Sequence, residues 1–289
     1  MTEQANRAVS VDPIRIGKIG YTNVWPIFWN FPPSEMDASC QVITQTPALI
    51  NRELIAGSLD IAVISSYAYA QHADKLLILP NLSISSKHAV GSVLLFSKRP
   101  LTDSLPQTIA LTSSSATSVH LLQIVMQRKF AHTPQYVSMH PDLNTMLQAC
   151  DAALLIGDDA IRASLNPAFN SLHLTDLAQL WREWTGFGMT FALWVVREDW
   201  AARNAEKVMF VYNALMAAKN HIYPISGAIL NEAIHQVGGS IAYWQSYYQQ
   251  LNYDFTLTEQ QGLRQYFALA HELGFLGRVP ELRLWQHPY

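Results

Sequence analysis

Several motifs that signal a common chemistry are missing from this 289-residue sequence. It has no glycine-rich G-x-G-x-x-G or P-loop segment, which argues against nucleotide binding. It has no H-E-x-x-H pair and its ten histidines are scattered singly, so we expect no metal site and no bound cofactor. A G-x-S-x-G nucleophile elbow is also missing. These absences together argue against nucleotide-dependent, metal-dependent and serine-hydrolase chemistry.

Cysteine, charge and long apolar runs are scarce. The two cysteines, Cys40 and Cys150, lack C-x-x-C spacing and fit reduced thiols of a cytosolic protein, with a single disulfide as the alternative. Charged residues make up 14% of the chain and the net charge is −3, so we expect no nucleic-acid partner. No apolar run approaches the ~20 residues of a membrane span, and residues 1–13 lack the apolar core of a signal peptide. We therefore expect a cytoplasmic protein without a membrane partner, either a monomer or a homodimer.

What the sequence does have is a large apolar content, 49%, and a length that suits one large or two ordinary α/β-type domains. Its most informative stretch is Ile109–Met126. A short apolar strand ends at Leu111, six of the next seven residues carry hydroxyls, and apolar side chains then recur at helical spacing. The positive end of such a helix suits a carboxylate or a phosphate. A plain helix cap is the alternative, since serine and threonine are ordinary N-caps.

Two further strand-to-helix junctions carry polar side chains. Thr22 and Asn23 follow a strand predicted over 14–19, and Pro26 suits the first turn of the next helix. Ser65 and Ser66 directly follow a strand predicted over 59–64. Because such ends meet at one edge of a parallel α/β sheet, we expect the junctions to share a cleft. Capping or holding the turn is the alternative role at both.

Strands predicted over 91–98 and 191–197 bracket a block with its own alternation of strands and helices. We interpret them as two crossover strands into and out of an inserted second lobe, residues 99–197, with residues 1–98 and 198–289 forming the first lobe. Gly91 allows a close backbone approach and Ser92 could donate to a bound acid. The last part of the chain is predicted to be helical over 206–221, 226–237, 240–251 and 258–274.

Titratable groups are few near these junctions. His88 is a candidate acid or base in a loop, whereas His120 lies inside a helix as a packing or surface residue. Asp158 and Asp159 follow a strand predicted over 151–156, where they most simply cap a helix. Many neutral donors with few titratable groups suit a binder of carboxylates better than a hydrolase.

Six motifs, in order along the chain, resemble the chorismate dehydratase family of the futalosine route to menaquinone. They are Arg15–Pro26, Gly57–Ser66, Gly91–Ser97, Ser115–Leu122, Leu154–Ala160 and Trp184–Phe187. The resemblance covers about residues 14–276. It implies an α/β, two-lobed type II periplasmic-binding-protein-like fold, each lobe a mostly parallel sheet flanked by helices, with a cleft between the lobes. Ala68 departs from the family, which usually has an acidic residue there, so the role of that acid is open.

The resemblance implies a carbon–oxygen lyase that dehydrates chorismate to 3-[(1-carboxyvinyl)oxy]benzoate. Asn23 would be catalytic, positioning the ring substituents or assisting the leaving hydroxyl. The base is not evident, and the enolpyruvyl carboxylate of the substrate could serve. A lyase acting on cyclic dehypoxanthinyl futalosine and a non-catalytic small-carboxylate-binding protein are the alternatives. The expected substrate-binding residues are Ser65, Ser66, Gly91, Ser92, Ser115, Thr117, Ser118 and Asp158.

Overall fold

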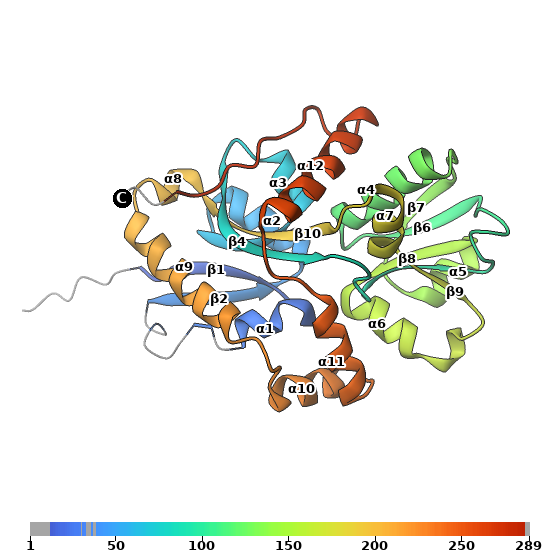
Figure 1. Cartoon of the computed structure of the whole chain (residues 1–289), viewed down its shortest axis with the longest axis horizontal. Helices are drawn as coiled ribbons and strands as arrows, with labels where there is room; N and C mark the ends of the chain where they lie inside the picture. Colours follow the sequence, from blue (N-terminus) through green and yellow to red (C-terminus); the bar gives the residue numbers. More distant parts are fainter. Residues whose placement is uncertain (1–11, 30, 33–35, 37–38, 287–289) are drawn as a thin grey trace, which may run out of the picture.

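Two five-stranded sheets lie side by side in the computed structural model, which describes residues 12–29, 31–32, 36 and 39–286 (Figure 1). Most of the N-terminal segment 1–13 considered above lies outside the described residues. The strand order is β2-β1-β3-β10-β4 in the first sheet and β7-β6-β8-β5-β9 in the second. We call the part of the molecule built on the first sheet the first lobe, and the part built on the second sheet the second lobe.

The strands are short and mostly buried. Those of the first sheet are β1 (Ile14–Ile19), β2 (Cys40–Gln45), β3 (Ile61–Ser65), β4 (Leu76–Ser86) and β10 (Met189–Arg197). Those of the second sheet are β5 (Val93–Ser97), β6 (Thr108–Thr112), β7 (Gln135–Met139), β8 (Ala152–Ile156) and β9 (His173–Asp176).

The pairing of these strands corrects one expectation. Each sheet has two parallel and two antiparallel pairings, so the sheets are mixed and not mostly parallel. The reason is that β5 and β10, the strands reached by passing from one sheet to the other, run against both of their neighbours. The predicted crossings over 91–98 and 191–197 correspond to these two strands, one in each sheet. The exact limits of the lobes stay a prediction.

The helices follow the strands of each lobe and then fill the last part of the chain. The first lobe has η1 (Thr22–Val24), α1 (Trp25–Phe28), α2 (Pro47–Ala56), α3 (Ser66–Gln71) and α8 (Glu198–Ala201). The second lobe has α4 (Ala116–Ile124), η3 (Val125–Lys129), α5 (Leu143–Ala149), α6 (Gly157–Leu165), η4 (Pro167–Phe169) and α7 (Leu177–Thr185). The C-terminal helices are α9 (Ala205–Asn220), α10 (Gly227–Val237), α11 (Ile241–Gln250) and α12 (Leu257–Glu272). These last four match the predicted helices to within two residues at each end.

The lobes share one hydrophobic core. A single buried apolar cluster includes Ile64 of the first sheet together with Leu95 and Leu154 of the second. Leu94 and Leu155 belong to a smaller separate cluster, because neighbouring residues of a strand point to opposite faces of the sheet. One face of the second sheet therefore packs toward the first lobe, and the other face has its own core.

Two features bear on the composition arguments. Cys40 and Cys150 are both free and buried, so the disulfide alternative is wrong. None of the helices in the described part of the chain combines the length and the apolar character that a membrane crossing needs.

A stack of rings joins the lobes through α3 and α4. The rings of Tyr67 and His120 are nearly parallel, with centroids 3.9 Å apart, and the ring of Phe275 lies 5.0 Å from His120. The Nδ1 atom of His120 lies 2.8 Å from the carbonyl oxygen of Ala116, which suits a ring that carries its proton on Nδ1. His120 is therefore a packing residue, one of the two roles expected of it.

This packing predicts a pH dependence of stability. Burial lowers the pKa of His120 below its ordinary value, with the carbonyl of Ala116 acting in the opposite direction. The unfolded chain then binds this proton more tightly, so the contribution of His120 is complete above about pH 6.5 and is lost as the pH falls toward the lower folded value. We expect His120→Phe to lose less Tm than the wild type between about pH 7 and pH 5 in thermal melts.

The control for this prediction is His221→Phe. His221 makes the same bond to a carbonyl four residues earlier, that of Ala217, but its side chain is exposed. Its replacement should leave the pH dependence of Tm as in the wild type. The same pH dependence in all three proteins would contradict the role given to His120.

Candidate active site

A cavity lies between the lobes, where the ends of strands from both sheets lead into helices. It encloses about 520 Å³ of empty space, part of which is open to solvent. Sixteen of the described residues line it, and none of these carries a charged side chain. The seven polar ones are Tyr21, Asn23, Ser65, Ser92, Ser114, Ser115 and Ser118. The chemistry available at this wall is therefore that of neutral hydroxyl and amide groups.

The cavity brings together five of the nine predicted site residues: Asn23, Ser65, Ser92, Ser115 and Ser118. Asn23 follows β1, Ser65 ends β3, and Ser115 and Ser118 follow β6. The three polar junctions thus meet at one place although they are far apart in the sequence. Ser92 reaches the same place from the segment that connects the two sheets.

The other four predicted residues lie near the cavity but do not line it. The hydroxyl of Ser66 donates to the carbonyl oxygen of Thr190 at 2.7 Å. The N–H of Gly91 donates to Asp176 at 2.7 Å. The remaining two residues form contacts between the lobes. Thr117 Oγ1 accepts the N–H of Tyr67, and Asp158 accepts hydrogen bonds from Thr22. These side and main chains hold the walls of the cavity in place.

The first turn of α4 faces the cavity. Ser115 is the N-cap, and its Oγ accepts the N–H of Ser118 at 3.2 Å. The Ser115 hydroxyl also donates to Ser118 Oγ at 3.2 Å, which leaves the proton of the Ser118 hydroxyl available to a ligand. A carboxylate at this turn would accept a hydrogen bond from the Ser118 hydroxyl and would be stabilised by the positive end of the helix dipole.

Ser65 and Ser92 present two more hydroxyls to the cavity. Ser65 is the N-cap of α3, and its Oγ accepts the N–H of Ala68 at 3.2 Å. Ser92 Oγ accepts the phenol of Tyr247 at 3.1 Å, whereas its own donation to the carbonyl of Val90 spans a weak 3.5 Å. The hydroxyl proton of Ser65 therefore has no acceptor among the described residues, and that of Ser92 is held only weakly, so both could be donated to a ligand oxygen. Ala68 itself does not line the cavity, so nothing in the wall takes the place of the acidic residue that the resemblance led us to consider.

Asn23 has an unusual amide. Its Oδ1 is buried and has no hydrogen-bond partner among the described residues. Leaving a buried acceptor unpaired costs roughly 1–3 kcal/mol, so such an atom in a cavity wall marks a place for a donor on a ligand. The backbone at Asn23 is held, since its carbonyl accepts the phenol of Tyr253 at 2.9 Å. The backbone that carries the amide is therefore held before a ligand arrives.

The sequence did not reveal Tyr21, Ser114 and Gly157 as parts of the wall. Gly157 has a φ of +56°, and a Cβ at this position would lie 2.9 Å from the ring of Tyr21. Burial raises the pKa of the Tyr21 phenol, and a hydrogen bond with Ser114 acts in the opposite direction. The only trace of this contact in the sequence is a glycine placed directly after a buried strand.

Tyr21 is also the only titratable side chain among the described residues that line the cavity. His88, the loop candidate for an acid or base, lines a different hollow with Tyr223 and Gln250. Over the whole described part of the chain, three or more His, Cys, Asp or Glu side chains nowhere gather so that they could hold a metal ion. The wall thus provides hydrogen bonds and no evident general base.

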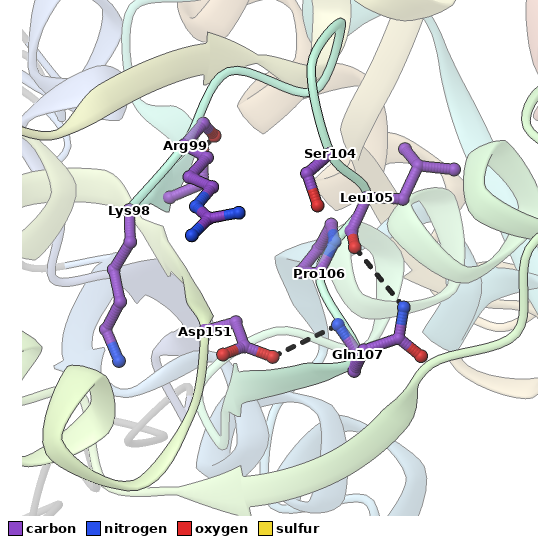
Figure 2. Close-up of a pocket in the computed structure, with 8 residues that line it drawn as sticks. Lys98, Arg99, Ser104, Leu105, Pro106, Gln107 and Asp151 are labelled. Carbon is purple, nitrogen blue, oxygen red and sulfur yellow. Dashed lines mark hydrogen bonds between the residues drawn. The ribbon is translucent and has the colours of Figure 1, made fainter.

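A larger hollow of about 730 Å³ lies at the opposite end of the second sheet (Figure 2). It touches the end of β5 at Ser97, whereas the cavity between the lobes touches the start of that strand at Val93. Its carboxylate, Asp151, already accepts the N–H groups of Gln107 and Thr108. One lobe alone forms this hollow and it contains none of the predicted residues, so we place the candidate active site between the lobes.

Comparisons with known proteins give the family and the fold. A sequence family described as menaquinone biosynthesis matches residues 14–272. A chorismate dehydratase of Thermus thermophilus is 34% identical over 202 residues, which cover 65% of this chain and 71% of that protein.

Two solved structures show the fold. The alkanesulfonate-binding protein SsuA of Xanthomonas axonopodis pv. citri, bound to MOPS, has a TM-score of 0.72 at 14% identity, over 96% of this chain and 99% of that one. The periplasmic aliphatic sulphonate binding protein SsuA of Escherichia coli has a TM-score of 0.69 at 15% identity, over 96% and 93%. At such identities the likeness concerns the fold alone, and it confirms the predicted type II periplasmic-binding-protein-like architecture.

Proposed function

The chain belongs to the menaquinone biosynthesis family, and from this premise we propose that it is a hydro-lyase that converts chorismate to 3-[(1-carboxyvinyl)oxy]benzoate and water. The relative from Thermus thermophilus is a chorismate dehydratase. The observation that carries the proposal is the neutral cavity between the lobes, with available serine hydroxyls and one unpartnered amide oxygen. Chorismate offers two carboxylates to accept from the hydroxyls and one hydroxyl to donate to the amide.

The reaction begins with loss of the proton on C3 of chorismate. This carbon is conjugated through a ring double bond to the ring carboxylate, so the electron pair left behind moves onto that carboxylate. Ser118 and the first turn of α4 would hold the ring carboxylate and stabilise the charge as it develops. One donor placed in this way contributes about 3 kcal/mol to the stability of a transition state.

The second step expels hydroxide from C4 and makes the ring aromatic. We place the C4 hydroxyl against Asn23, because the unpartnered Oδ1 can accept its hydrogen bond. The NH₂ group of the same amide can donate to the oxygen as it leaves. The proton lost from C3 and the departing hydroxide together make the water that is released.

The enolpyruvyl carboxylate of chorismate is the proposed base. One of its oxygens reaches the C3 proton through a six-membered ring, so the transfer needs no side chain. The described lining residues support this, since they include no carboxylate, imidazole, amine or thiol. The role of the protein is then to hold the substrate in the reactive conformation and to stabilise the dienolate.

Incubating the purified protein with chorismate tests the proposal. Proton NMR should show the ring diene converting to an aromatic product at a rate proportional to protein concentration, and heat-denatured protein should give none. Binding without conversion would point to a carboxylate-binding protein. Conversion of cyclic dehypoxanthinyl futalosine in place of chorismate would point to the alternative lyase. Either of these results would contradict the proposed function.

A further inference from the structure

The turn that carries Asn23 is tied to the opposite lobe by a buried carboxylate. Asp158, the second residue of α6, is only 7% exposed. Its Oδ1 accepts the hydroxyl of Thr22 at 2.7 Å and the N–H of Thr22 at 3.1 Å, and its Oδ2 lies 3.3 Å from the same N–H. Thr22 is fully buried and directly precedes Asn23.

Among the described residues, only Thr22 forms hydrogen bonds with the carboxylate of Asp158. The nearby Arg162 forms its ion pair with Asp159 instead. Burial raises the pKa of Asp158, and the hydrogen bonds from Thr22 act in the opposite direction. A buried carboxylate needs such bonds to offset its loss of hydration, so the contact with Thr22 favours the arrangement in which the lobes are together.

Tyrosines near the end of α11 also bond to the same turn. The phenol of Tyr248 lies 3.5 Å from the carbonyl oxygen of Thr22, and that of Tyr253 lies 2.9 Å from the carbonyl oxygen of Asn23. The carbonyl of Asn23 is thus held by Tyr253 and that of Thr22 only weakly by Tyr248, while Asp158 holds the N–H and the hydroxyl of Thr22. Removal of Asp158 would leave the turn with the hydrogen bonds from these tyrosines.

We propose that Asp158 is a positioning residue, which acts through Thr22 to hold the amide of Asn23 against the cavity when the lobes are together. The inference rests on the proposed function, because it concerns the residue that faces the leaving hydroxyl. It replaces the direct contact with substrate that the sequence led us to expect for Asp158. It also gives the short turn between β1 and α1 a partner in the other lobe.

A double-mutant cycle tests this role. Asp158→Ala is expected to lower kcat by roughly tenfold or more, because a displaced catalytic group is costly. If Asp158 acts through Asn23, the double variant Asn23→Ala with Asp158→Ala should be no slower than Asn23→Ala alone. Asp158→Asn, which keeps one acceptor oxygen for Thr22, should recover part of the loss. Losses that multiply would overturn the inference.

The matched control is Asp159→Ala. Asp159 is the next residue of α6, but its carboxylate pairs with Arg162 and does not meet Thr22. This variant should keep the kcat of the wild type. If Asp158→Ala does not fold, Thr22→Val takes its place in the cycle, since valine removes the hydroxyl bond and keeps the size of the side chain. An equal loss of kcat in Asp159→Ala and Asp158→Ala would overturn the inference.

Hydrogen exchange of the Thr22 amide gives a readout that needs no turnover. In the ligand-free protein, the exchange rate of this amide should be higher in Asp158→Ala than in the wild type, and unchanged in Asp159→Ala. Unchanged exchange in Asp158→Ala would overturn the inference even if chorismate is converted. If the wild type converts no chorismate, the proposed function fails, and the contact between Asp158 and the Asn23 turn is still decided by the exchange rates.

Discussion

Asn23→Ala is expected to lower kcat by roughly 10²-fold while the Kd for chorismate changes only a few-fold. The amide oxygen of Asn23 is buried, unpartnered and held by a fixed backbone, so its main contribution should come when the C4 hydroxyl begins to leave. The serine hydroxyls that hold the carboxylates stay in place, so binding is largely kept. Steady-state kinetics together with calorimetric titration of chorismate separates the two effects.

Asn51→Ala is the control for this variant. The amide oxygen of Asn51 is also buried without a partner among the described residues, but Asn51 belongs to α2 and does not line the cavity. Its replacement should leave kcat unchanged. Unchanged turnover in Asn23→Ala would remove Asn23 from the mechanism, and a similar loss in both variants would trace the effect to buried amides in general.

Gly157→Ala is expected to lower kcat/KM by roughly tenfold or more and to reduce stability as well. An alanine at a φ of +56° costs about 1–2 kcal/mol in the backbone. The added methyl group would also lie 2.9 Å from the ring of Tyr21, which must then move from its place in the cavity wall. Thermal melts and steady-state kinetics on chorismate measure the two effects separately.

Gly186→Ala separates the backbone cost from the displacement of the ring. Gly186 has a φ of +77°, and a Cβ there would meet no atom within 4 Å. This variant should have a lower Tm than the wild type, because its backbone cost is comparable to that of Gly157→Ala, but it should keep the kcat/KM of the wild type. The same kcat/KM in Gly157→Ala and Gly186→Ala would show that the position of Tyr21 does not matter for turnover.

Local sequence patterns predicted the elements that depend on neighbouring residues. The hydroxyl-rich turn before α4 and the four C-terminal helices follow from capping residues and apolar spacing, which act over a few positions. The direction of β5 and β10 could not be predicted in this way. Both strands are buried on both faces and read as continuous apolar runs, which do not distinguish a parallel from an antiparallel neighbour.

The same limit explains which parts of the candidate site were predicted. A serine or threonine after a strand is recognisable from the sequence, but the group that it bonds is not. Ser66 bonds a carbonyl 124 residues away, and Thr117 bonds an N–H 50 residues away. Asp158 meets Thr22 across 136 residues. Only the folded chain shows that these three polar groups bond to the protein itself, whereas Ser65, Ser92 and Ser118 line the cavity, where we propose that they donate to a ligand.

A crystal structure of the Asn23→Ala variant with chorismate bound tests the central claim most directly, because slow turnover should preserve the substrate. The account predicts chorismate between the lobes, with one carboxylate at Ser118 and the first turn of α4, and the C4 hydroxyl directed at residue 23. Chorismate bound instead in the hollow beside Lys98 and Arg99, or with both carboxylates turned away from the serine hydroxyls, would contradict it.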